Sequence, residues 1–254
     1  MRMNHKQKLY FRDQLREARA VALRDAEAFG EIIHVLERMG CLLLGRIAAL
    51  GTYRPLIVEA ASESELAKDI PNEWPDMHIC FYKLYELVRI SRNAAMHEGS
   101  FARHLTFHAI ELSLILEDSL MTGFDKVNDY MVRNPVCASL WQPLSFIRQS
   151  MLINSFSYLP VHLETNNEST WQLISDLAIA GYLRTNLHGE VSPKRLGHKL
   201  EEAIANGVKL TSTRVCNPDV SITNVLNGWD GTPILVQSNY SKDLIGIITP
   251  FDLL

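Results

Sequence analysis

The sequence has few cysteines and no excess of basic residues. The four cysteines are too far apart to form a CxxC pair, at Cys41, Cys80, Cys137 and Cys216. This spacing indicates neither a disulfide framework nor a metal cluster, so we expect buried free thiols. The net charge of −4 excludes a globally positive surface. A nucleic acid would therefore have to be held by a local basic patch.

The sequence also lacks a long apolar run. The most apolar stretch, CLLLGRIAAL at 41–50, contains Arg46 and is too short to span a bilayer. The first twenty residues are charged, with helical patterning, and contain no apolar signal core. We therefore expect a cytoplasmic protein with no membrane partner.

Helical periodicity fills the first half of the chain. Apolar residues recur at three- and four-residue spacing over 11–50, 77–97 and 101–121. Residues 51–55 are expected to end the first run, and 55–75 to be a proline-containing connector. Gly123 follows the last run, as is typical after a helix. Residues 1–124 are thus predicted to form an all-α domain.

The pattern changes after Gly123, where short strand-like and helical segments occur in the same order twice. Pro160 and Ser175 in the first copy align with Pro233 and Thr249 in the second, at separations of 73 and 74 positions. Two anchors that agree within one residue indicate an internal repeat. Residues 125–254 are thus predicted to form an α+β domain pair.

The repeat carries a turn that offers ligand-binding groups. In the second copy the turn reads Gly246-Ile-Ile-Thr249-Pro-Phe-Asp252. Glycine allows close backbone approach, and the Thr249 hydroxyl with the helix N-terminus could donate to a phosphate. The Asp252 carboxylate could accept hydrogen bonds from ribose hydroxyls. A simpler interpretation makes Thr249 only a helix N-cap.

This repeat and turn resemble a pair of CBS domains, the modules named after cystathionine β-synthase. The resemblance covers about 125–187 for the first copy and about 195–254 for the second. It implies binding of an adenine nucleotide, AMP, ADP or ATP, at Gly246, Thr249 and Asp252. In the first copy Ser175 replaces the threonine, while Gln172 and Ala178 replace the glycine and the aspartate. At most one full-strength site is therefore expected.

A second candidate site lies in the helical half. Arg92, Asn93 and His97 fall within six residues of a helical stretch. Histidine can move the protons that RNA cleavage requires, and arginine can stabilise the charge of a phosphorane. Asn93 could orient the histidine or the phosphate, while Arg89 and Arg103 could help to form the basic patch.

The Arg-Asn-x-x-x-His spacing in a helical domain resembles the HEPN family. The resemblance implies a metal-independent endoribonuclease that acts as a homodimer on RNA and leaves 2′,3′-cyclic phosphate ends. The expected chain is then a HEPN-like helical bundle followed by a CBS pair. It would be a nucleotide-regulated ribonuclease of toxin or defence type, with an antitoxin or regulatory partner and no catalytic cofactor.

Two alternatives stay open at this point. The arginines, asparagine and histidine could belong to an ordinary solvated helix, which leaves a non-catalytic nucleotide sensor whose helical domain binds a partner. His104 and His108, one helical turn apart, could be read as zinc ligands. The sequence offers no evident third ligand, so we expect them to be structural and predict no metal site.

Overall fold

The computed structural model describes residues 3–95, 102–165, 168–184 and 193–254. It divides into two compact units, Met1–Phe124 and Asp125–Leu254. The first unit is helical and the second is α+β.

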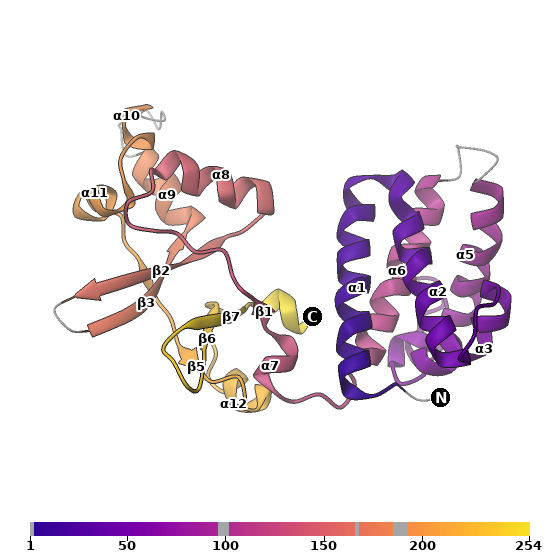
Figure 1. Ribbon diagram of the computed structural model, residues 1–254. Helices are drawn as coiled ribbons and strands as arrows, with labels where there is room; N and C mark the ends of the chain where they lie inside the picture. The colour runs from indigo at the N-terminus through magenta and orange to yellow at the C-terminus, as the bar shows by residue number, and fades with distance from the viewer. Residues whose placement is uncertain (1–2, 96–101, 166–167, 185–192) are drawn as a thin grey trace. The chain divides into compact units, whose positions relative to one another are not determined.

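The helical unit is a bundle in which α1, α2, α5 and α6 run side by side (Figure 1). Its elements are α1 (His5–Arg24), η1 (Ala26–Phe29), α2 (Gly30–Leu44), α3 (Leu50–Ala61), η2 (Glu65–Ala67), α4 (Asp69–Glu73), α5 (Phe81–Ala95) and α6 (Ala102–Met121). One apolar cluster, which includes Leu15, Met39 and Leu112, fills the space between them. The helical periodicity of the sequence therefore reports a real buried face.

Left-handed glycines end two of these helices. Gly45 follows α2 at φ 78° and Gly123 follows α6 at φ 82°. Because glycine has no Cβ, it adopts this conformation without the steric cost that other residues meet.

The expectation that residues 51–55 end the first helical run is wrong. They lie inside α3, and so does part of the expected connector, while the predicted run is divided at Asp25 and at Gly45. Packing overrides the proline signal at Pro55. Tyr53, on the first turn of α3, is fully buried, and its hydroxyl oxygen accepts a hydrogen bond from the Ala48 N–H at 2.5 Å.

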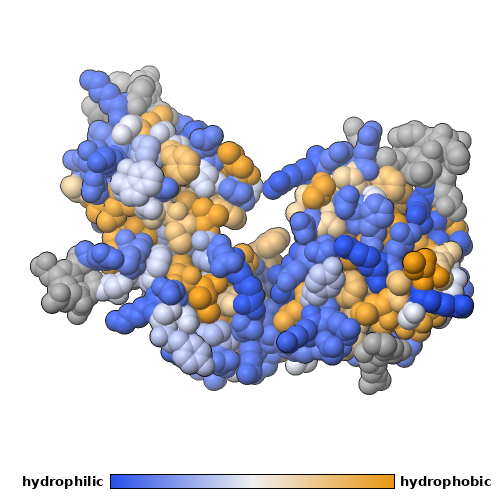
Figure 2. All heavy atoms as spheres, in the orientation of Figure 1, coloured by the Kyte–Doolittle hydropathy of each residue, from blue (hydrophilic) through white to orange (hydrophobic). Residues whose placement is uncertain are grey.

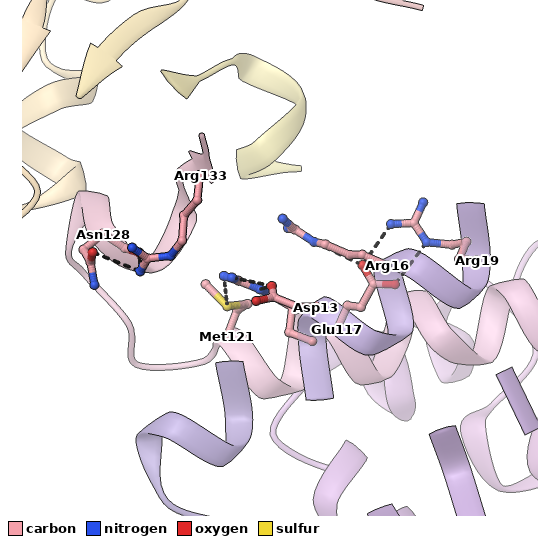
Figure 3. Close-up of polar contacts among 8 residues, drawn as sticks. Asp13, Arg16, Arg19, Glu117, Met121, Asn128 and Arg133 are labelled. Atoms are coloured by element: carbon pink, nitrogen blue, oxygen red, sulfur yellow. Dashed lines mark hydrogen bonds and ion pairs between the residues drawn. The ribbon is translucent and has the colours of Figure 1, made fainter. Parts of the chain in front are cut away.

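A buried carboxylate links α1 to α6. Glu117 of α6 is 6% exposed. Arg19 of α1 holds it with two hydrogen bonds of 3.0 and 2.9 Å, and the Arg16 Nε lies 3.4 Å from its Oε2 (Figure 3). A buried carboxylate is tolerated when it is paired in this way.

The C-terminal unit contains two small sheets. Its strands are β1 (Val132–Arg133), β2 (Tyr158–Thr165), β3 (Glu168–Ser175), β4 (Thr211–Ser212), β5 (Val215–Cys216), β6 (Ile234–Gln237) and β7 (Leu244–Ile248). Its helices are α7 (Val127–Tyr130), α8 (Leu144–Asn154), α9 (Asp176–Leu183), α10 (Pro193–Leu196), α11 (Leu200–Ala205), α12 (Ile222–Leu226) and η4 (Pro250–Leu253).

Each sheet forms one module. The first module is the sheet β2-β3-β4 with α8, α9 and α11, and the second is the sheet β1-β7-β6-β5 with α7, α12 and η4. The segment 127–133 packs with the second module, although it precedes the first in sequence. Residues 200–212 pack with the first module. Each module therefore includes a segment from outside its contiguous repeat.

The strand pairing shows which residues are equivalent in the β2–β3 and β6–β7 hairpins. Ile174 lies opposite Leu159 in the first module, and Ile248 lies opposite Ile234 in the second. If Ile174 and Ile248 are equivalent, Leu159 is the counterpart of Ile234. The sequence alignment had paired Ile234 with Val161, two positions later. The strand pairing observed in the two hairpins, rather than the shared proline, gives this register.

The two sheets meet through a small apolar cluster. Leu173 of β3 packs with Leu235 of β6 and Ile247 of β7. The helices α8 and α9 pack on the first sheet through a separate core that includes Leu144, Ile147 and Ile174.

Helix α2 approaches α3 closely at one glycine, which gives a stability test. A Cβ built on Gly40 would lie 2.2 Å from the ring of Tyr53. We predict that Gly40→Ala lowers the free energy of unfolding by about 1–3 kcal/mol, because overpacking must displace a buried ring.

The matched control is Gly30→Ala, since a Cβ there meets nothing within 4 Å. We expect this second substitution to be neutral or slightly stabilising. Urea titration followed by circular dichroism measures both. Equal stability of the two variants would contradict the packing described here.

Candidate functional site

A large cleft lies within the C-terminal unit. Its volume is about 950 Å³, and its lining residues are drawn from 132–136, 154–160, 231–233 and 247–254. The first module supplies the end of α8 and the start of β2, and the second supplies β7 and η4. This size falls in the range of small-molecule sites.

Two of the predicted nucleotide-binding residues line this cleft. Thr249 lies between β7 and η4, and Asp252 lies within η4. Oδ2 of Asp252 accepts hydrogen bonds from the Thr249 backbone N–H at 2.7 Å and from its hydroxyl at 2.8 Å. The pair therefore forms a capping arrangement and also faces the cleft.

The helix after this turn offers fewer donors than the sequence suggested. Element η4 is a short 3-10 helix that begins at Pro250, which has no backbone N–H. The N–H of Asp252 is bonded to the carbonyl oxygen of Thr249 at 3.1 Å. Neither of these two positions therefore has a backbone N–H left to bind a phosphate, and the phosphate-binding role of this turn stays a prediction.

Gly246 has a structural reason for being glycine. A Cβ at this position would lie 2.5 Å from Sδ of Met131. Gly246 pairs with Arg133 across the β1–β7 ladder, and it is not among the residues that line the cleft. The sequence predicted a close approach to the backbone at this glycine, and it is the Met131 side chain that makes this approach.

Ser175 lies in the first module and is not among the residues that line this cleft, although it pairs with the lining residue Tyr158 across the β2–β3 ladder. It is the N-cap of α9, and its hydroxyl oxygen accepts a hydrogen bond from the Ala178 N–H at 3.1 Å. The side chain is buried, so the N-cap role accounts for this residue.

The sequence analysis did not identify the apolar walls of the cleft. They include Val136, Phe156, Tyr158 and Pro160. Arg133 is the one charged residue within 132–136 and 154–160, and it does not line the cleft. No sequence signal marked these walls, because Ser155, which adopts φ 55° after α8, is not a residue that indicates a left-handed turn.

In the helical unit, two of the predicted arginines, Arg89 and Arg92, are paired with carboxylates. Arg92, in the last turn of α5, forms an ion pair with Glu37 of α2 at 2.9 Å. Arg89 lies 2.7 Å from Glu86, which also pairs with Arg54 of α3 at 2.8 Å. These three arginines and two glutamates leave a net charge of +1 on the cluster.

The arginines change the titration of the carboxylate between them. Hydrogen bonds from Arg89 and Arg54 lower the pKa of Glu86. The same bonds raise the pKa of both arginines, and burial raises the pKa of neighbouring Tyr85. The Glu86 carboxylate therefore stays ionised at neutral pH, and a phosphate would compete with it for Arg89 and Arg54.

The other predicted residues of this site can be placed only in part. Asn93 lies in α5 and Arg103 in α6, where the structure describes the backbone. His97 lies outside the described residues. His104 is exposed, and Nδ1 of His108 lies 3.9 Å from the Glu111 carboxylate.

Within the described part of the chain, no three histidine, cysteine or acidic side chains gather as metal ligands. Among the described helices, none has the length and apolarity needed to cross a bilayer. Figure 2 shows mostly hydrophilic surface on each unit, with smaller apolar patches.

The four cysteines are free and only half-buried, which corrects the expectation of fully buried thiols. Burial raises the pKa of the Cys137 and Cys216 thiols. Both therefore favour the protonated form at neutral pH.

No protein-family model matches this chain, and no curated protein matches it either. Similar solved structures include a CBS domain-containing protein from Bacillus anthracis, at 20% identity and a TM-score of 0.41, covering 50% of this chain and 88% of that one. Another is a CBS-domain containing protein from Agrobacterium tumefaciens, at 13% identity and a TM-score of 0.37, covering 52% and 93%.

A third similar structure is CBSX2 in complex with AMP, at 18% identity and a TM-score of 0.36. It covers 50% of this chain and 92% of that chain. These three likenesses are distant.

Proposed function

We propose that this protein is a regulator that responds to an adenosine nucleotide, AMP, ADP or ATP, bound in the cleft of the C-terminal unit. The helical unit supplies the output. One observation carries the proposal: the two turn residues suited to a nucleoside, Thr249 and Asp252, line a cleft of about 950 Å³.

The cleft offers groups for each part of a nucleoside. The apolar and aromatic walls at Val136, Phe156 and Tyr158 suit a planar base, because burial of its faces is favourable. Asp252 suits the ribose, whose hydroxyls are donors that a carboxylate accepts. Oδ2 of Asp252 already accepts two bonds from Thr249, so the ribose either uses Oδ1 or replaces the Thr249 hydroxyl.

Binding should therefore depend on Asp252. We predict that Asp252→Ala weakens the binding of AMP by about 10- to 100-fold, because a hydrogen bond to a charged group contributes about 1.5–3 kcal/mol. Isothermal calorimetry on the full chain measures this, with adenosine, ADP and ATP as further ligands.

The control is Asp176→Ala, which removes an exposed aspartate from the turn that opens α9 in the first module. It should bind as the wild type does. If no adenosine compound binds the wild type, or if Asp252→Ala binds equally well, the assignment of the cleft is wrong.

A second candidate function is RNA cleavage by the helical unit, under control of the ligand cleft. The observation that favours it is the position of Arg92 in the last turn of α5. Its side chain is 37% exposed, so a phosphate could reach it. In this proposal Arg92, Asn93 and His97 perform the chemistry, and Arg89 and Arg103 bind the RNA. A homodimer would bring two His97 side chains to the acid and base roles.

The ribonuclease proposal makes a sharp prediction. A dimer of twice the 28.8 kDa chain mass should cut RNA in EDTA and leave 2′,3′-cyclic phosphate ends. His97→Ala should slow cleavage by about 10²- to 10⁴-fold through loss of proton transfer. Arg92→Ala should slow it by about 10²- to 10³-fold through loss of charge stabilisation.

Gel assays on total RNA, with and without each adenine nucleotide, measure cleavage, and light scattering measures mass. His104→Ala is the matched control, since this histidine is exposed on α6. Absence of cleavage by folded wild-type protein would leave the helical unit as a binding module for an antitoxin or other regulatory protein.

A further inference from the structure

A smaller cavity, which we call the α9 cavity, lies on the first module. Its volume is about 290 Å³, which is close to the lower limit for small-molecule sites. Its lining comes from α9, from α10 and from the stretch that follows α11. None of the described residues that line it also lines the ligand cleft, so the two sites are separate.

The floor of the α9 cavity is an apolar face of α9. Gly181 lies one helical turn beyond Leu177 and Ala178, so these three lining residues share one face of the helix. The Leu177 side chain is 78% exposed. A Cβ built on Gly181 would meet nothing within 4 Å, so the glycine leaves room above this face. A small apolar group would therefore gain by being buried here.

Arg195 of α10 is held in place beside this floor. Its Nη1 donates a hydrogen bond to the carbonyl oxygen of Tyr182, and its Cζ lies 5.0 Å from the centroid of the Tyr182 ring. That ring is itself fixed, because it is buried and its hydroxyl oxygen lies 2.7 Å from Nδ1 of His198. The hydrogen bond occupies one of the five guanidinium N–H donors. The remaining donors are thus positioned in advance for an anion.

The charged side chains in the lining have one sign. Among the described residues that line the α9 cavity, Arg195 and Lys209 are the two with charged side chains. Neither forms an ion pair with another described residue. The carboxylates of Asp176 and Glu202 do not line the cavity, and each accepts a backbone hydrogen bond at the start of its own helix. The lining therefore offers two positive charges that lack a carboxylate partner.

We propose that the α9 cavity binds a small organic phosphate. The phosphate would lie between Arg195 and Lys209, and the apolar part of the molecule would rest on Leu177 and Gly181. A phosphate monoester carries up to two negative charges near neutral pH, which matches the two cations better than a carboxylate does. The arginine fork can hold two of the phosphate oxygens at once. The C-terminal unit would then bind a second small molecule, independently of the nucleotide cleft.

Calorimetry on the full chain, in a low-salt buffer free of phosphate, tests the proposal with phenyl phosphate as the probe. We expect phenyl phosphate to bind about tenfold more tightly than inorganic phosphate, because its ring is buried on α9. It should also bind more tightly than benzoate, which carries one charge, while phenol should not bind measurably. Added salt should weaken the binding, because it screens the charges.

Four variants locate the binding. Gly181→Leu fills the floor but keeps both cations, and it should remove measurable binding. Lys209→Gln and Arg195→Gln each remove one cation and should weaken binding about tenfold or more. Lys199→Gln is the matched control, since it changes the net charge equally but lies outside the lining, where its amine pairs with a carboxylate at 3.5 Å. Circular dichroism confirms that each variant is folded.

Three results would overturn the proposal. They are phenyl phosphate binding no more tightly than phenol, unchanged binding by Gly181→Leu, and equal weakening by Lys199→Gln and Lys209→Gln. If Arg195→Gln does not fold, the Gly181 and Lys209 variants still decide the matter. Asp252→Ala should leave phenyl phosphate binding unchanged, so failure of the nucleotide cleft and failure of the α9 cavity are distinguishable.

Discussion

The ligand cleft depends on the apolar contact that holds the two sheets of the C-terminal unit together. Leu173, Leu235 and Ile247 form this contact, and Leu173 and Leu235 have no exposed surface. The lining of the cleft comes from the start of β2 on one sheet and from β7 and η4 on the other. If the sheets separated, Thr249 and Asp252 would remain a helix cap but would no longer face an apolar wall.

The two modules also exchange segments, and this exchange helps to hold the two sheets together. Strand β1 joins the second sheet beside Gly246, where Met131 occupies the space that a side chain would need. Residues 200–208 complete the core of the first module. Each module is thus finished by a segment that lies beyond its own repeat, so neither half of the sequence repeat holds a complete core.

Sequence reasoning succeeded where a local pattern has one physical meaning. Helical periodicity located α5 and α6, and Gly123 ends α6 in the left-handed conformation that the sequence suggested. It failed at Pro55, where burial of Tyr53 outweighs the local cost of proline within a helix. The cleft walls were not predictable, because hydrophobic residues in a wall and in a core look alike in sequence.

Charge pairing shapes both candidate sites, in opposite ways. In the helical unit, Glu37 and Glu86 partly neutralise Arg92 and Arg89, and the pKa of Glu86 is lowered as a result. In the cleft, the carboxylate of Asp252 faces neutral surroundings. The sequence identifies the charged residues of both sites, but only the fold shows which of them are paired with an opposite charge.

The most direct test of the central claim is hydrogen exchange of the full chain with and without saturating adenosine, read by mass spectrometry. The account predicts slower exchange in 154–160 and 247–254, the two stretches that face each other across the cleft. Exchange in α11, Leu200–Ala205, which contributes no residue to the cleft lining, should stay unchanged. Protection of α11 alone, or no protection in either stretch of the cleft, would contradict the proposed site.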